Sequence, residues 1–267
     1  MGSNTDAQIP KDLKRPPLLG DLTFSPDDSR SLGGLNYYSK AFKDGGQANL
    51  DILVRNVGLT NTSLLLDWGC GTGRLTEAST TVLPVANYYG MDINNRYVID
   101  CKSRNPSHRV DWINVQHDEY NRTGTLDPHS YAVPYADKKF DIIAAFGVFN
   151  HLRFRMIVHC LREMWRTLKP GGRIVFTAIL LNHNSINLIN TGQTVKPFAF
   201  KHMHEDGWSE TEERPLLNFA IPETSLRRAL LRCNFMIKEP VRYGHWCKSP
   251  LAITGHDVII ASKSNNG

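Results

Sequence analysis

A glycine-rich loop between a short apolar run and a helical pattern constrains this chain more than any other feature. Within residues 63–67, the three leucines between Ser63 and Asp67 form a continuous apolar run that is too short for a helix, and the sequence DWGCGTG at residues 67–73 follows directly. A run of this kind predicts a central parallel strand that is covered on both faces. Glycines after such a strand let the backbone turn tightly and approach a ligand without an intervening Cβ. The segment therefore predicts a strand, a ligand-binding loop and a helix in succession.

Strand and helix patterns alternate along most of the remaining chain. Further strands are predicted over residues 88–93, 111–116, 140–146, 173–180, 235–241 and 257–262, and helices over residues 47–57, 74–82, 97–103, 154–168 and 223–232. Strands that alternate with helices indicate a Rossmann-like, doubly wound α/β sheet. The chain has 267 residues, 41% of them hydrophobic, which is enough to fill one core. We therefore expect a single domain.

Residues 121–132 and 182–219 do not follow the alternation, and an N-terminal segment precedes it. Residues 1–45 are rich in Pro, Gly, Asp and Ser and are predicted to form an arm or lid, with Tyr37 and Tyr38 offering aromatic faces to the ligand. Residues 182–219 are predicted to be an insertion that covers the site, because long connections in such domains are often binding loops. The core then comprises residues 46–181 and, as its C-terminal part, residues 220–267.

A second acidic residue points to a nucleoside ligand. Asp92 ends the next predicted strand, ~20 residues beyond the loop, where a carboxylate can accept hydrogen bonds from both hydroxyls of a ribose. The loop itself has the spacing GxGxG rather than the GxGxxG of dinucleotide-binding folds, which argues against a pyrophosphate. We therefore expect a nucleoside that lacks a pyrophosphate group.

Five ordered motifs resemble the class I S-adenosylmethionine (SAM)-dependent methyltransferases. They are LLLDWGCGTGRL, GMDIN, VQHD at residues 115–118, VPYADKKFDIIAAFGVFNHL and LREMWRTLKPGGRIVFTA, and together they span residues 60–180. The later segments LLNHNS and YGHWCKSPLAITGHDVIIASK are similar to a poorly characterised subgroup associated with glycan and secondary-metabolite pathways. The resemblance implies a mostly parallel seven-stranded sheet whose last strand is antiparallel, and SAM as cofactor, with S-adenosylhomocysteine as product.

The resemblance also implies which positions bind the donor. Asp92, with its neighbour Ile93, holds the ribose, and the strand end at Phe146 offers a backbone carbonyl to the amino group. Asp118 matches the acid on the adenine side, acting with His117 or Glu119. The remaining donor positions lie in the glycine-rich loop and are Asp67, Trp68, Gly69, Cys70, Gly71 and Gly73, although Gly73 is equally compatible with a role in helix packing.

Methyl transfer from a sulfonium is an in-line displacement that needs no nucleophilic residue, but a hydroxyl acceptor must lose a proton. His151, just beyond the strand that closes the methionine side, is the candidate base, and capping the next helix is the equally weighted alternative. Asn150 and Asn182 are candidates for orienting the acceptor hydroxyl. His183 and His245 are reserve bases.

Charge and composition restrict the partners. We predict a small-molecule acceptor, a hydroxyl-bearing sugar or secondary metabolite. The net charge of +5 keeps RNA or protein methylation open as an alternative, although nucleic acid is not the expected partner. A catalytically silent scaffold is a third possibility, against which the intact acids and glycines of the donor motifs argue.

Metal and membrane partners are not expected. The sequence HMHED at residues 202–206 contains two histidines and two acids, but an exposed polar loop is the favoured interpretation, so no metal is predicted. Five cysteines without a CxxC pair and the lack of a long apolar run favour a cytoplasmic protein without a membrane partner. The oligomeric state is not predicted.

Overall fold

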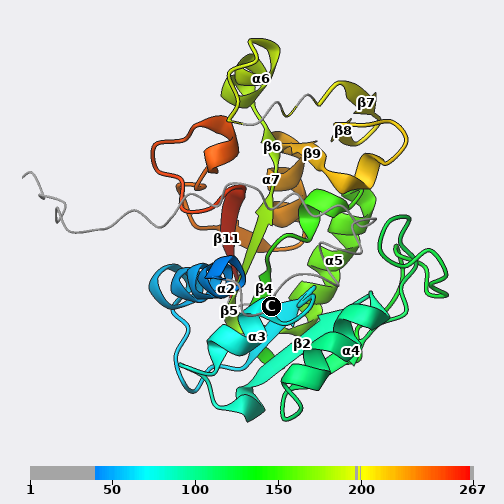
Figure 1. Cartoon of the computed structure of the whole chain (residues 1–267). Helices are drawn as coiled ribbons and strands as arrows, with labels where there is room; N and C mark the ends of the chain where they lie inside the picture. Colours follow the sequence, from blue (N-terminus) through cyan, green and yellow to red (C-terminus); the bar gives the residue numbers. More distant parts are fainter. Residues whose placement is uncertain (1–39, 196–197, 199, 265–267) are drawn as a thin grey trace, which may run out of the picture.

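A seven-stranded sheet forms the centre of the computed structural model, which describes residues 40–195, 198 and 200–264 (Figure 1). The strands run in the order β10-β11-β5-β4-β1-β2-β3, and β11 lies antiparallel to β5 and β10. The predicted Rossmann-like sheet with an antiparallel last strand is therefore confirmed. The bounds are β1 Leu65–Trp68, β2 Tyr88–Asp92, β3 Arg109–Trp112, β4 Phe140–Ala145, β5 Leu168–Ala178, β10 Phe235–Ile237 and β11 Asp257–Lys263.

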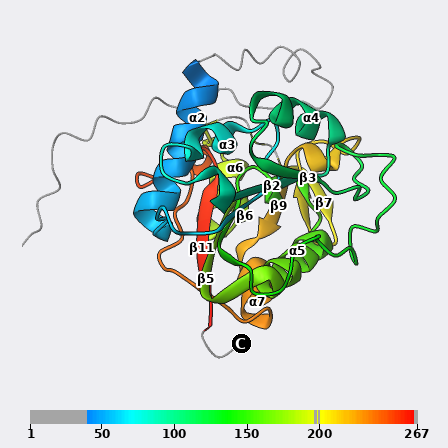
Figure 2. The same cartoon turned by 90° about the horizontal axis from the view of Figure 1, so that it is seen from below.

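Helices cover both faces of this sheet, which explains why its central strands are mostly apolar. Side chains alternate between faces along a strand, so Leu65 packs into one apolar cluster and Leu66 into the other. Helices α5 and α7 lie on the opposite side of β5 and β11 from α2 (Figure 2). The bounds of the helices around the central sheet are α2 Lys40–Ile52, α3 Arg74–Ser79, α4 Asn95–Arg104, α5 Phe154–Thr167 and α7 Glu223–Arg232.

A second, four-stranded sheet includes most of the segment predicted to be an insertion, residues 182–219, together with residues on either side of it. Its order is β6-β9-β8-β7, and Figure 1 shows it with α6 at the end of the molecule away from β2 and α4. Phe198, Phe200 and Trp246 pack in a small apolar cluster beneath it. The bounds are β6 Leu180–Leu181, α6 His183–Asn190, β7 His202–His204, β8 Gly207–Ser209 and β9 Phe219–Pro222.

The interpretation of residues 202–206 as an exposed polar loop is wrong. Strands β7 and β8 form a hairpin here, and both histidines are partly buried. Asp206 accepts a hydrogen bond of 2.7 Å from the backbone N–H of Phe154, at the start of α5. The acid therefore satisfies a free donor at a helix N-terminus and ties the hairpin to the core.

Several predicted boundaries shift by a few residues. The helix predicted from residue 47 begins at Lys40 and ends in a π-helical turn, Leu53–Val57. The strand predicted to extend to residue 116 ends at Trp112, because the following residues form a loop in which Val115 bridges to Leu126. The strand predicted to residue 241 ends at Ile237, before Pro240, which has no N–H to donate to a neighbouring strand.

Tyr37 and Tyr38 lie outside the described residues. Within the described part of the chain, none of the helices combines the length and apolarity that crossing a membrane requires.

Candidate active site

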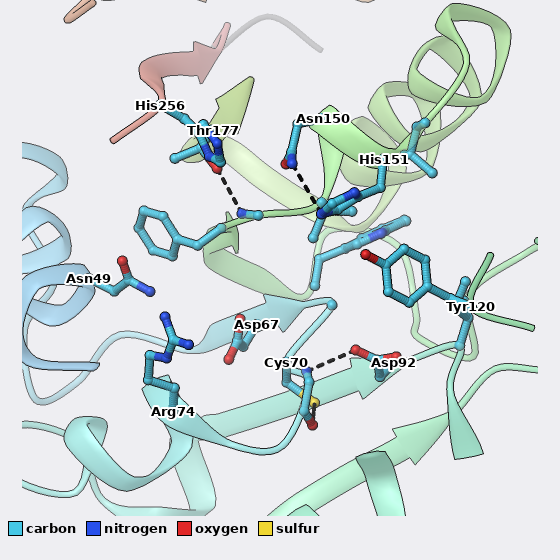
Figure 3. Close-up of a pocket in the computed structure, with 18 of the residues that line it drawn as sticks. Asn49, Asp67, Cys70, Arg74, Asp92, Tyr120, Asn150, His151, Thr177 and His256 are labelled. Atoms are coloured by element: carbon cyan, nitrogen blue, oxygen red, sulfur yellow. Dashed lines mark hydrogen bonds between the residues drawn. The ribbon is translucent and has the colours of Figure 1, made fainter. Parts of the chain in front are cut away.

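A cavity of about 750 Å³ opens at the carboxyl ends of β1, β2 and β4 (Figure 3). Most of the residues singled out in the sequence line it. They are Asp67, Trp68, Gly69, Cys70, Gly71, Asp92, Ile93, His117, Phe146, Asn150 and His151, together with the reserve base His245. Carboxyl ends of parallel strands are where open α/β sheets bind ligands, so the fold itself gathers these residues.

The glycine-rich loop is pinned to the neighbouring strand. Backbone N–H groups of Gly69 and Cys70 both donate to the carbonyl of Met91, at 2.8 and 2.9 Å. Gly69 and Gly71 have φ angles of 75° and 55°, in the left-handed region that favours glycine. A Cβ on Gly71 would meet no atom within 4 Å. Because Gly71 lines the cavity, this open space leaves its backbone accessible to a ligand.

Two acids flank the loop, and of these Asp67 is buried and Asp92 is partly buried. Asp67 accepts a hydrogen bond of 2.7 Å from the hydroxyl of Tyr88, and burial raises the pKa of Asp67 to about 7. Asp92 accepts 2.8 Å hydrogen bonds from the backbone N–H groups of Gly71 and Asn94, and burial raises the pKa of Asp92 to about 6. Each oxygen of the Asp92 carboxylate uses one lone pair for these bonds and keeps another for a ligand.

Four predicted site residues lie outside the lining. A Cβ on Gly73 would approach the Sγ of Cys101 to 2.6 Å, so this glycine permits the loop to pack on α4. Asp118 is exposed. Glu119 is bound by the guanidinium of Arg214 at 2.7 Å, and Asn182 caps α6 by accepting a hydrogen bond from the backbone N–H of Ser185 at 3.0 Å. The reserve base His183 lies beside Asn182 in a separate, shallower groove.

His117 connects two loops of the site. Its Nε2 donates to the carbonyl of His151 at 2.8 Å, while its Nδ1 accepts from the backbone N–H groups of Glu119 and Tyr120, at 3.1 and 3.3 Å. A carbonyl requires a donor and an N–H requires an acceptor, so the ring is neutral with its proton on Nε2. Burial also lowers the pKa of His117. Both ring nitrogens are therefore occupied by the backbone.

The His151 ring has the opposite tautomer. Its Nδ1 donates to the carbonyl of Leu216 at 3.1 Å, and its Nε2 accepts from the Nδ2 of Asn150 at 3.1 Å (Figure 3). Burial lowers the pKa of His151 to about 4. The amide is oriented by this pairing, because its nitrogen must face the imidazole lone pair. The Oδ1 of Asn150 is consequently buried and has no partner among the described residues.

Sequence reasoning did not identify several residues that line the cavity. Arg74 directly follows the glycine-rich loop, within the first family motif, so its position could have indicated a site residue. Asn49 comes from α2, whose pattern indicates only a packed helix, so no signal marked it. The others come from loops and the second sheet, where hydrophobic periodicity carries no information about a ligand. They include Tyr120, Glu210, Asn218, Trp246 and His256. Within the described part of the chain, no three His, Cys, Asp or Glu side chains are grouped so that they could hold a metal ion.

Sequence comparisons match a known domain family in the region that contains the glycine-rich loop. Residues 66–176 match the model of a methyltransferase domain. Over 183 residues the chain is 26% identical to the U6 snRNA methylphosphate capping enzyme Amus of Drosophila melanogaster, covering 65% of this chain and 60% of that protein. Over 112 residues it is 30% identical to a demethylmenaquinone methyltransferase of Halalkalibacterium halodurans, covering 41% and 40%. The chain thus spans less than two thirds of the length of these curated relatives.

The fold is shared with solved structures. A SAM-dependent methyltransferase of Methanosarcina mazei matches with a TM-score of 0.50 and 17% sequence identity, over 79% of this chain and 97% of that chain. At this identity the likeness concerns the fold alone. It covers more of the chain than residues 66–176 and agrees with the strand order described above.

The donor of this family, SAM, fits the residues that line the cavity. The free lone pairs of Asp92 suit the two hydroxyls of its ribose. Open space at Gly71 and at Gly147, where a Cβ would likewise meet nothing within 4 Å, leaves room for close approach. The family match, the strand order and the lining residues agree that residues 66–176 form a methyltransferase domain of the class I SAM-dependent type.

Proposed function

We propose that this chain transfers a methyl group from SAM to a hydroxyl oxygen of a small molecule. One observation carries the proposal: a single cavity joins two differently built parts of the chain. The donor half consists of the loops after β1, β2 and β4 and the adjoining face of α2. The acceptor half consists of residues 210–218 and 245–256, which follow the family match. A cavity shared in this way suits a reaction between two ligands.

The proposed chemistry needs orientation and one proton transfer. When bound, SAM supplies an electrophilic methyl group whose carbon–sulfur bond breaks as the acceptor oxygen forms its new bond, with the electron pair passing to sulfur. Asp92 would hold the ribose, and the open space at Gly71 would allow the donor to approach the backbone. His151 accepts the hydroxyl proton at Nε2, after the Asn150 amide releases that lone pair. Its low pKa keeps the imidazole neutral, and therefore able to accept a proton, throughout the neutral range.

Similarity to an RNA-capping enzyme favours a second candidate, methylation of an RNA end. The residues that line the cavity support methylation of an RNA end less well than methylation of a small molecule. Among the residues that the structure describes, Arg74 is the only Lys or Arg in the lining, and it lies in the donor half. Glu210 is an acid in the acceptor half, where its carboxylate accepts from the Nδ2 of Asn218 at 2.8 Å. A phosphate-rich acceptor would favour cations there.

A two-step experiment tests the proposal. Titration calorimetry with S-adenosylhomocysteine, and with NAD as a control, is expected to show binding of the sulfur compound alone. Transfer of tritium from methyl-labelled SAM is then compared between a panel of neutral hydroxylated metabolites and a 5′-triphosphate RNA oligomer. Labelling of a hydroxylated metabolite supports the proposal. Labelling of the RNA alone, or the lack of donor binding, contradicts it.

A further inference from the structure

Two cysteines lie together where the glycine-rich loop packs on α4, and neither has a part in the steps above. Cys70 belongs to the loop and lines the cavity (Figure 3), whereas Cys101 is a fully buried residue of α4. Hydrogen bonding between the two thiols raises the pKa of Cys70 and lowers that of Cys101. A Cβ on Gly73 would lie 2.6 Å from the Sγ of Cys101, and one on Gly90 would lie 3.2 Å from the Sγ of Cys70. Two glycines thus make room for a pair of sulfurs, one of them at the cavity wall.

A chain of hydrogen bonds connects this pair to Asp67. The hydroxyl of Tyr88 donates to the Asp67 carboxylate at 2.7 Å, and its oxygen lies 2.7 Å from the Oγ1 of Thr76. The Oγ1 of Thr76 lies 3.5 Å from the Sγ of Cys101. Each hydroxyl and thiol has one proton to donate, so the chain runs in one direction, from Cys70 through Cys101, Thr76 and Tyr88 to the carboxylate. Burial raises the pKa of Asp67 to about 7, so this acid can hold a proton taken from the pair.

Joining the two sulfurs would disturb the donor half. A disulfide bond is about 2.05 Å long, well below the contact distance of two separate thiols, so Cys70 must move toward α4 as the bond forms. The Sγ of Cys70 lies 3.7 Å from the carbonyl oxygen of Gly71, and the N–H of Gly71 donates to Asp92 at 2.8 Å. A movement of Cys70 therefore reaches the residue that orients the Asp92 carboxylate.

We propose that Cys70 and Cys101 are a redox-sensitive pair, which a hydroperoxide converts to a disulfide that lowers the affinity of the donor half for SAM. The oxidant reaches Cys70 through the cavity when the donor is absent. This inference rests on the proposed function, because the loss of affinity concerns SAM as the donor.

The oxidation proceeds in two balanced steps when hydrogen peroxide is the oxidant. The sulfur of Cys70 attacks one peroxide oxygen, the oxygen–oxygen bond breaks, and the departing hydroxide leaves as water with the thiol proton. The sulfur of Cys101 then displaces hydroxide from the sulfenic acid on Cys70, and this hydroxide takes the second thiol proton. Two thiols become one disulfide while the peroxide is reduced to two molecules of water. Asp67 holds each proton in transit through the chain of hydrogen bonds.

Oxidation of the full chain, followed by peptide mapping, tests the pair directly. Reduced wild type is treated with hydrogen peroxide, the remaining thiols are alkylated, and tryptic peptides are analysed by mass spectrometry without reduction. We expect a disulfide between the peptides of Cys70 and Cys101, which dithiothreitol removes and saturating S-adenosylhomocysteine slows. Calorimetry is expected to show about tenfold weaker S-adenosylhomocysteine binding after oxidation, as the loss of one hydrogen bond to a charged group would give.

Three variants separate the parts of the inference. Cys101→Ser is expected to stop at the sulfenic acid of Cys70, which dimedone labels. Thr76→Val interrupts the chain of hydrogen bonds at similar shape and is expected to slow oxidation about tenfold, because less Cys70 is present as thiolate. Cys233→Ser is the matched control, because Cys233 is buried at the end of α7 and outside the cavity lining. It is expected to form the same disulfide at the wild-type rate and to lose the same affinity.

The outcomes distinguish this inference from the proposed function. If no disulfide joins Cys70 to Cys101, or if that disulfide leaves the affinity for S-adenosylhomocysteine unchanged, the inference is wrong while the proposed function stands. If Thr76→Val oxidises as fast as the wild type, the chain to Asp67 has no part in the reaction. If the reduced wild type does not bind S-adenosylhomocysteine, the proposed function fails and the inference fails with it.

Discussion

The donor half and the acceptor half of the cavity are held together by different means. The donor half is formed by strand ends of one parallel sheet, and its loop is fixed by local hydrogen bonds to the next strand. The acceptor half depends on a buried acid that is distant in sequence from most of its partners. Asp257 accepts hydrogen bonds of 2.8, 2.7 and 2.8 Å from the backbone N–H groups of Leu180 and Gly244 and from the indole of Trp246.

This difference shows that the two halves can be perturbed separately. A change in the glycine-rich loop or its acids alters the lining of the proposed donor half, whereas a change at Asp257 alters the loop that carries His245 and His256. The first half depends on a motif that the family shares, and the second on tertiary contacts made by residues 180–257. Experiments can therefore assign a measured effect to one half.

The largest effect is expected at Asp92. Asp92→Ala removes an acceptor for two ribose hydroxyls, and two hydrogen bonds to a charged group amount to about 3 kcal/mol, or a loss of S-adenosylhomocysteine affinity of about 100-fold. Calorimetry measures the affinity, and circular dichroism verifies that the fold is retained. Asp118→Ala is the control, because Asp118 is exposed and outside the lining. If Asp118→Ala lost more S-adenosylhomocysteine affinity than Asp92→Ala, the ribose would be assigned to Asp118 instead.

A substitution at His151 is expected to have an effect of similar size, but on kcat rather than on donor affinity. His151→Ala removes the proposed base, and general-base catalysis contributes about 100-fold at the lower end of its range. Donor affinity is expected to stay close to that of the wild type, because the imidazole contacts Leu216 and Asn150. Initial rates with a methyl acceptor measure kcat. His183→Ala, in the separate groove, is the control, and an unchanged kcat in His151→Ala would assign His151 a structural role only.

Asp257→Asn is expected to act on the acceptor half alone. The amide can no longer accept from all three donors, and one unsatisfied buried donor costs about 2 kcal/mol of the free energy of unfolding. Hydrogen exchange of residues 244–256 should accelerate, while S-adenosylhomocysteine affinity is retained. Trp246→Phe, which removes one of the three donors, should give a smaller change of the same kind. Weakened donor binding in Asp257→Asn would show that the halves are coupled.

The smallest effect is a pH dependence of donor binding. Because burial raises the pKa of Asp92 to about 6, this group becomes protonated as the pH falls from 7 to 5. Loss of the carboxylate should weaken S-adenosylhomocysteine binding by up to about tenfold. Because the pKa of Asp92 is raised in the folded state, its contribution to the stability of the unliganded protein is present at low pH and is lost as the pH rises through 6. Weaker S-adenosylhomocysteine binding at pH 5 would therefore not reflect unfolding caused by Asp92. Calorimetry across this range measures it. Asp92→Asn should have a weaker pH dependence than the wild type, because only Asp67, whose pKa burial raises to about 7, still titrates in the donor half.

Much of the donor half could be predicted because its information is local. The apolar run before the loop predicted β1, and burial on both faces explains why the residues before Asp67 are all leucine. The loop spacing and the acid at Asp92 identified residues that do line the cavity. Phe149–His151 forms a short 3-10 helix directly after β4, so Asn150 and His151 also follow from their place in the chain.

Local patterns failed where contacts are long-range. Asp118 and Glu119 follow a strand that ends earlier than predicted, and the loop that replaces it turns Asp118 to solvent. Asn182 has the chemistry of an orienting residue, but its side chain is used to cap α6. The hairpin of β7 and β8 could not be predicted because short strands carry little periodicity. Its turn is held by a long-range hydrogen bond from the backbone N–H of Phe154, at the start of α5, to Asp206.

The sequence by itself determined the sheet, its glycine-rich loop and the acids that flank the donor, because strand burial, backbone turning and strand-end position depend on neighbouring residues. Only the tertiary structure decided which residues complete the cavity. Arg74 meets α2 through two glycines nearly 30 residues earlier in the printed sequence, and Asp257 organises a loop that closes the other side. The tautomer of His151, and with it the orientation of Asn150, depends on a carbonyl at Leu216. Such contacts join segments that only folding brings together.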